Sequence, residues 1–228
     1  MNELQGFGFV LPHWAYWGWL AIMPLILMAL TGGSKAGSDA GDDELPAVVS
    51  EENAVPPYDE GTALTRAIDW LSNASGIFVA FWTINAVVFY FYEVIMRYFF
   101  NMPTIWVHES SYLLFGMQYL LTGAFALLHG AHVRVDILYV KLPPRGRVGM
   151  DILTSVIFFV FALAMVWTSW TFMLSSMGMN EVSLETWQIQ YWPVKMVMFI
   201  GSVLILLAGL SKLINDIRLF RRMGQGVA

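Results

Sequence analysis

The segment ILTSVIFFVFALAMVWTSWTFMLSSM, residues 152–177, contains no charged residue and decides the fold class. A helix of ~20 apolar residues crosses the ~30 Å hydrocarbon core of a bilayer, and in lipid such a segment must be helical to satisfy its own backbone hydrogen bonds. Four comparable apolar segments occupy roughly residues 14–30, 71–92, 105–128 and 192–213. The pattern predicts an all-α, multi-pass membrane bundle with four core transmembrane helices and one further N-terminal helix.

The composition agrees with a membrane protein and narrows the chemistry. Apolar residues make up 57% of the chain and charged residues only 13%. The chain has no cysteine, which excludes disulfides, thiolate nucleophiles and cysteine-ligated metal sites. No nucleophile elbow, phosphate-binding glycine loop or cluster of carboxylates at metal-ligand spacing is present. We therefore expect neither an enzyme nor a bound cofactor or metal, and no nucleic-acid partner.

The N-terminal part divides into an apolar helix and an acidic linker. Residues 1–30 resemble a signal peptide in length, but no Lys or Arg precedes the apolar stretch, so we interpret it as a retained helix. Residues 31–61 are rich in Gly, Ser, Pro and acids, which predicts a flexible cytoplasmic linker, or alternatively a segment that docks onto a basic patch of a partner. Residues 62–220 form the predicted four-helix domain, in which residues 62–70 are an amphipathic approach segment along the cytoplasmic surface. Residues 221–228 are a tail.

Basic residues predict the orientation, because Lys and Arg in short loops stay in the cytoplasm. They gather after the third apolar segment and near the C-terminus, whereas the loop after the fourth contains acids and aromatic residues. The C-terminus is therefore predicted to be cytoplasmic, and that aromatic loop is predicted to lie outside with interfacial anchors. The basic residues are Arg134, Lys141, Arg145, Arg147, Lys212, Arg218, Arg221 and Arg222, and the anchors are Trp187, Tyr191 and Trp192.

Arg97 is the cation that this orientation leaves on the outer side, at the end of the second apolar segment. Glu93 lies four residues earlier, which is the favourable order for an ion pair on one helix face. Glu109 opens the next helix beyond Pro103 and offers a pair across the hairpin. We expect Glu109 to be the partner, because a pair between helices would fix their docking. A proton or ion relay is the alternative role for these groups.

Glycines and polar side chains inside the apolar segments have a simpler expected role. Gly116 and Gly123 lie on one face of the third segment, and Gly201 and Gly209 lie on one face of the fifth, which predicts close helix packing. Asn85, Gln118 and a few Ser and Thr residues are expected to form hydrogen bonds between helices. Transporters that bind ions in the membrane break their helices with Gly or Pro near the midplane in two repeated halves, and this chain has no such pattern.

The sequence RYFFNMPTIWVHE (residues 97–109), with Gly123, HVRVDIL (residues 132–138) and LPPR (residues 142–145), resembles the small membrane (Q) subunit of tripartite ATP-independent periplasmic (TRAP) transporters, a DctQ-like family. The family's recurrent features fall on Arg97, Pro103, Trp106, Glu109, Gly123, His132 and Asp136. Where the family often has two adjacent acids, this chain has His108 followed by Glu109. The N-terminal helix and acidic linker are not part of the usual four-helix unit.

The resemblance implies a function in transport. Such a subunit would be a multi-pass protein of the bacterial inner membrane, in contact with lipids and with the large membrane subunit, whose scaffold it would hold. The complex would take up small organic anions, commonly carboxylates, delivered by a periplasmic substrate-binding protein. Sodium coupling would be located in the large subunit.

Histidines suggest an alternative function, a membrane anchor that carries haem in a respiratory or redox complex. Two axial histidines must face each other from different helices at one depth. The second, fourth and fifth apolar segments contain no histidine, so His13 with His108 is the pair that geometry allows. The ordinary role for His132 is an interfacial hydrogen bond helped by Asp136, one helical turn later.

Overall fold

The computed structural model describes residues 9–30, 62–130 and 142–224, and these residues are almost entirely helical. The helices are α1 (His13–Leu30), α2 (Ala63–Ala80), α3 (Trp82–Tyr98), α4 (Val107–Leu128), α6 (Pro144–Met179) and α7 (Trp192–Gly224). No strand forms in the described ranges, where an isolated bridge joins Val182 to Gln190. Among the described residues, five helical segments are long and apolar enough to cross a membrane, with α2 and α3 taken as one. The predicted all-α membrane fold is confirmed.

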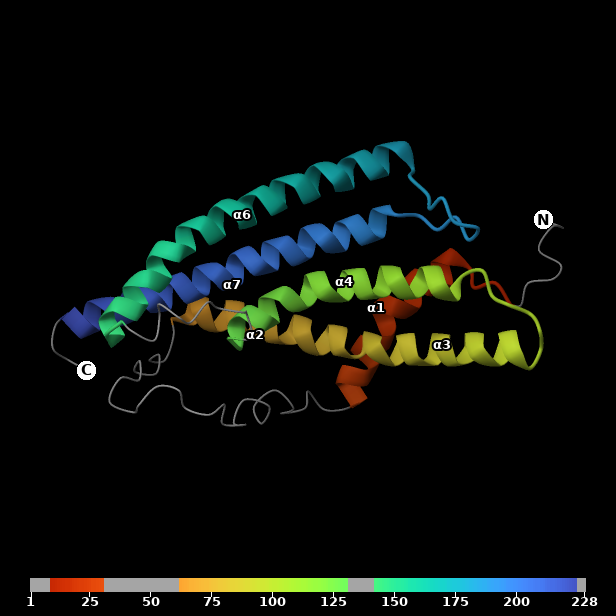
Figure 1. Ribbon diagram of the computed structural model, residues 1–228, viewed down its shortest axis with the longest axis horizontal. Coiled ribbons are helices and arrows are strands. Elements are labelled where there is room, and N and C mark those ends of the chain that lie inside the picture. The colour runs from red at the N-terminus through yellow and green to blue at the C-terminus, as the bar shows by residue number, and fades with distance from the viewer. Residues whose placement is uncertain (1–8, 31–61, 131–141, 225–228) are drawn as a thin grey trace.

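The second predicted span is longer than expected, because α2 and α3 form one nearly straight rod (Figure 1). They meet at Phe81, which keeps right-handed helical angles, so the rod continues through this residue. The buried positions of α2 recur every three or four residues: Thr65, Ile68, Ser72, Gly76 and Val79. This stripe packs α2 into the bundle from its first turn onward. Residues 62–70 are thus the first part of a packed helix, and their location along the cytoplasmic surface stays a prediction.

Helix α7 lies at the centre of the packing. It contacts α6, α4 and α2, whereas α6 packs mainly on α7. Small residues allow these close approaches: a Cβ added at Gly201 would lie 2.8 Å from the backbone oxygen of Leu120 on α4, and one added at Gly209 would lie 2.1 Å from Phe158 on α6. The predicted packing role of these two glycines agrees with the structure.

Helix α1 crosses the bundle at a steep angle (Figure 1). Trp19 and Met23, one helical turn apart on α1, both contact Asn85 of α3, which is the pattern of a crossing rather than a parallel pair. The buried apolar cluster extends along α2, α3, α4 and α7, and where α1 meets α3, α4 and the loop before α7 it contains Tyr16, Phe89, Trp106 and Trp187. The N-terminal helix is thus packed on the chain's own bundle.

Candidate functional site

The turn between α3 and α4 contains the first group of predicted site residues. Asn101 adopts a left-handed conformation (φ 53°), and Pro103 follows it before α4 begins. The backbone N–H of Thr104 donates to a carboxylate oxygen of Glu93 at 3.0 Å, and the Thr104 hydroxyl donates to the same oxygen. Glu93 therefore ties the turn to the last part of α3.

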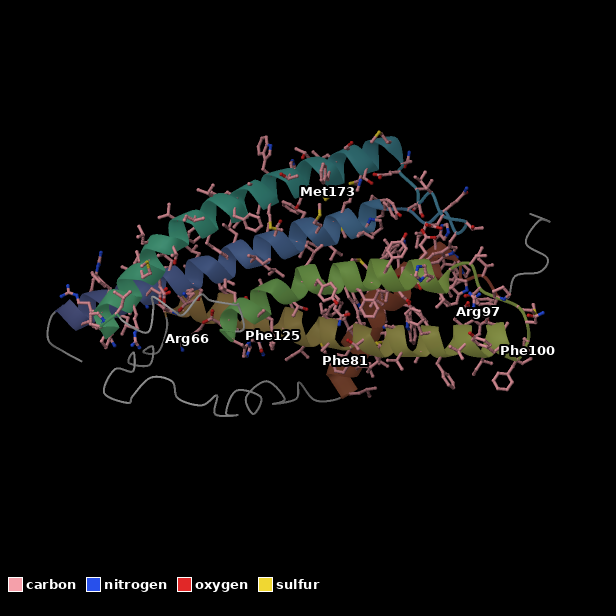
Figure 2. The ribbon with its side chains drawn as sticks, viewed as in Figure 1. Arg66, Phe81, Arg97, Phe100, Phe125 and Met173 are labelled. Carbon is pink, nitrogen blue, oxygen red and sulfur yellow. The ribbon has the colours of Figure 1, made fainter. Side chains whose placement is uncertain are left out.

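Arg97 pairs with Glu93, not with Glu109. Its Nε donates to Glu93 at 2.8 Å, and its guanidinium forms an ion pair with the same carboxylate. The expected pair across the hairpin is wrong, because Glu93 lies one turn away on the same helix face and is already held at the turn by Thr104. Figure 2 shows Arg97 and Phe100 at the end of α3, far along the rod from Arg66.

Glu109 is instead buried inside the bundle. It is 2% exposed, and neither carboxylate oxygen accepts a hydrogen bond of normal geometry from the described residues. The polar and ionisable groups near this carboxylate are Ser183, Glu185, His13 and the backbone of Trp187. Its position in the first turn of α4 places the carboxylate near the positive end of the helix dipole. Glu109 thus lies at a junction of three segments rather than at the hairpin surface.

We call this junction the aromatic end of the bundle: Trp106, Trp187 and Tyr16 around Glu109. The rings of Trp106 and Trp187 lie 6.1 Å apart, and Tyr16 contacts Trp187 edge-on at 5.2 Å. Trp187 is only 4% exposed, so its predicted role as an interfacial anchor is wrong. The sequence contains one signal of this packing, the density of Trp and Tyr at the start of α1, where Trp14, Tyr16, Trp17 and Trp19 lie close together in the chain.

The polar residues within the helices divide into two groups. Asn85 accepts a hydrogen bond from Trp19 Nε1 at 2.7 Å, and Gln118 donates to Thr83 at 2.7 Å, so these two do join helices as predicted. Thr122, Thr168 and Thr171 donate to backbone oxygens of their own helices. The latter bonds need no partner helix.

The predicted glycine pair on α4 also separates. A Cβ added at Gly123 would lie 2.6 Å from Ile205 of α7, so Gly123 marks a close contact. Gly116, two turns away, has no atom within 4 Å of the same position and is exposed. Packing within this chain therefore explains Gly123 but not Gly116.

The opposite end of the bundle, which we call the basic end, contains Arg145, Arg147 and Lys212. The guanidinium of Arg145 lies over the ring of Phe220 at 4.9 Å, and buried Arg147 donates to the Leu142 oxygen at 2.9 Å. A cavity of about 250 Å³ opens here between α4, α6 and α7, with Lys212 in its wall. His132 and Asp136 lie outside the described residues, as does the acidic linker.

The histidines of the haem hypothesis have other neighbours. His13 donates from Nε2 to the Trp187 oxygen at 3.0 Å, and His108 lies edge-on to Tyr112. His129 bonds the Phe125 oxygen at the end of its own helix. Within the described ranges, no group of three or more metal-ligating side chains comes together.

Comparison with known families decides the class of protein. The model of the family described as "Tripartite ATP-independent periplasmic transporters, DctQ component" matches residues 86–219, more than half of the chain. The chain belongs to the DctQ family. No curated protein sequence matches it.

A DctQ protein is the small membrane subunit of a TRAP transporter, not an enzyme, and it is a multi-pass protein of the inner membrane. The match begins within α3 and ends near the end of α7, so it leaves out α1 and α2. The part of this DctQ protein that the family defines therefore includes Trp106, Glu109 and Trp187, whereas the residues of α1 that contact them lie outside the match.

Proposed function

We propose that this chain braces the large membrane subunit of a sodium-coupled TRAP transporter that takes up small organic anions, carboxylates above all, from a periplasmic binding protein. The observation that carries the proposal is the bare side of α6. This helix packs on α7, and its other side exposes a row of apolar residues that includes Leu153, Val156, Ile157, Val160 and Trp167. A second membrane subunit packed on this row would widen the part of the complex that stays fixed.

The continuity of the helices supports a bracing role over a carrying one. Ion-coupled carriers bind their ions at backbone groups freed by broken helices. In the described part of the four-helix bundle, the irregularity at Phe81 keeps helical angles and involves neither Gly nor Pro. Sodium and the organic anion are therefore assigned to the large subunit.

Co-purification with the large subunit tests the proposal. We expect Val160→Trp, on the exposed side of α6, to reduce recovery of the large subunit and uptake by about tenfold, because a large side chain in a packed interface prevents close approach. Val87→Trp is the matched control, since Val87 is equally exposed (65% against 67%) but lies on α3. Loss with Val87→Trp alone would move the interface to α3. Full assembly and uptake in cells that lack this chain would refute the bracing role.

The orientation has its own experiment. We propose that the basic end and the C-terminus are cytoplasmic, following the bias of Lys and Arg. A C-terminal fluorescent protein that matures only in the cytoplasm should be bright, and an alkaline phosphatase fused at the same place should be inactive. The reverse result would invert the topology.

A further inference from the structure

Residues 9–20, which we call the strap, lie across the aromatic end and accept hydrogen bonds from it. The indole N–H of Trp106 donates to the Phe9 oxygen at 2.7 Å, and that of Trp187 donates to the Leu11 oxygen at 3.1 Å. Both tryptophans are 4% exposed. A buried indole N–H without an acceptor is costly, so each of these side chains depends on the strap.

The strap also forms side-chain bonds to two different elements. His13 donates to the Trp187 oxygen at 3.0 Å, in the loop between α6 and α7. The hydroxyl of Tyr16, a fully buried residue, donates to the Ser110 oxygen on α4 at 2.8 Å. The strap therefore joins the α6–α7 loop to the start of α4, two regions that are distant in sequence.

Glu109 lies beneath the strap in the same junction. Its carboxylate is shielded from solvent and accepts no regular hydrogen bond among the described residues. The ionisable groups that face it are His13 and Tyr16 of α1, Tyr112 of its own helix and Glu185 of the loop. Without the strap, water would reach and hydrate this carboxylate. Hydration of the charge would then favour an open state of the junction over the closed one.

We propose that the strap is a conformational clamp that closes the aromatic end over Glu109 and holds the α6–α7 loop on α4. The tryptophans that grip it belong to the family-matched region, whereas the strap itself lies outside the match. The strap thus closes the matched part of the bundle from outside the match. The clamp also fixes the end of α6 that leads into the loop, and so helps α6 to dock on the large subunit. This effect on docking rests on the proposed function, in which α6 is the docking helix.

Labelling of a single cysteine tests the clamp on the purified chain. The protein has no cysteine, so Ser110→Cys places one thiol at a position that is 0% exposed under the strap. We expect slow reaction with a water-soluble maleimide in detergent. Combining Ser110→Cys with Trp106→Phe, Trp187→Phe and Tyr16→Phe removes three donors and leaves a phenyl ring at each position, and should speed labelling by about tenfold or more. Unchanged labelling in this variant would overturn the proposal.

Two controls keep the result interpretable. Trp14→Phe changes a tryptophan of the strap that is 80% exposed, and it should leave labelling of Ser110→Cys unchanged; acceleration here would also contradict the clamp. Should the triple variant fail to fold, Ser110→Cys with Tyr16→Phe alone should still label about threefold faster, and no acceleration would count against the clamp. Thr186→Cys, exposed on the loop, gives the reference rate for open thiols.

Co-purification separates the clamp from the proposed function. If the labelling result holds but the triple variant still recovers the large subunit fully, the clamp exists and does not set the docking of α6. If no large subunit is ever recovered, the bracing proposal fails while the labelling result stands.

Discussion

Helices α6 and α7 are neighbours of similar length and apolarity, yet they have opposite positions in the fold. Within the most apolar 18-residue stretch of each helix, 33% of the residues of α7 are buried, compared with 11% of those of α6. Helix α7 has small residues where other helices approach, such as Gly201, Ser202 and Ala208, whereas the outward side of α6 has large ones, such as Phe161 and Trp167. Apolarity therefore marks a membrane helix, and the size of its residues indicates whether protein surrounds it.

The test with the largest expected effect on the comparison of α6 and α7 uses two adjacent residues of α6. Ala162 is 1% exposed and Leu163 is 57% exposed. We expect Ala162→Phe to destabilise the chain by about 3 kcal/mol, because an aromatic ring cannot fit within the packed interior. Leu163→Phe should change stability by less than about 0.5 kcal/mol. Unfolding of both variants at increasing SDS fraction in mixed micelles measures the difference, and equal effects would mean that α6 is not one-sided.

A second test compares glycines on α7 and α4. Gly201→Ala should destabilise the chain by about 1–3 kcal/mol, because the added Cβ would lie 2.8 Å from a backbone oxygen of α4 that cannot move freely. Gly116→Ala should be neutral or stabilise by up to about 1 kcal/mol, since the site is open and alanine favours the helix. The same unfolding assay applies. A stabilising Gly201→Ala would show that the α4–α7 contact is looser than described.

These two tests also show what the sequence could predict. Apolar length located every span, and small residues indicated the helix contacts at Gly123, Gly201 and Gly209, because these properties are local. The partner of Arg97 was wrong because both candidate carboxylates fit the spacing, and the choice depended on Thr104, which reaches Glu93 only after the turn has folded. The burial of Trp187 was missed for a related reason: its acceptor lies 176 residues away. Tryptophan near a membrane edge is normally an interfacial anchor.

A third test compares two residues near the α3–α4 turn: Glu93, which bonds both Arg97 and Thr104, and Arg97, which bonds Glu93. Arg97→Ala should cost only about 0.2–1 kcal/mol, because the side chain is half exposed and its pair lies within one helix. Glu93→Ala should cost more, about 1–3 kcal/mol, because it also leaves the Thr104 backbone N–H without an acceptor. A larger loss in Arg97→Ala than in Glu93→Ala would restore a role for Arg97 across the hairpin. Thermal unfolding in detergent distinguishes the two orders.

The smallest expected effect concerns the loop that joins α6 to α7. Lys195, at the start of α7, holds the pKa of Glu181 below its ordinary value of 4.5. The folded chain therefore binds a proton at Glu181 less readily than the unfolded chain. Its stabilisation is complete at neutral pH and is lost as the pH falls through 4.5 and below.

Comparison with Glu181→Gln isolates this contribution. Both members of the pair are about a quarter to a third exposed, so the wild type should be more stable by only about 0.2–1 kcal/mol at pH 7. The difference should shrink as the pH falls below 4.5, and high salt should reduce it at pH 7 because solvent ions screen an exposed pair. A difference that stayed constant over this fall in pH would mean that Glu181 acts through packing rather than charge. In that case the contact between Glu181, after α6, and Lys195, at the start of α7, would stabilise the chain by packing and not by charge.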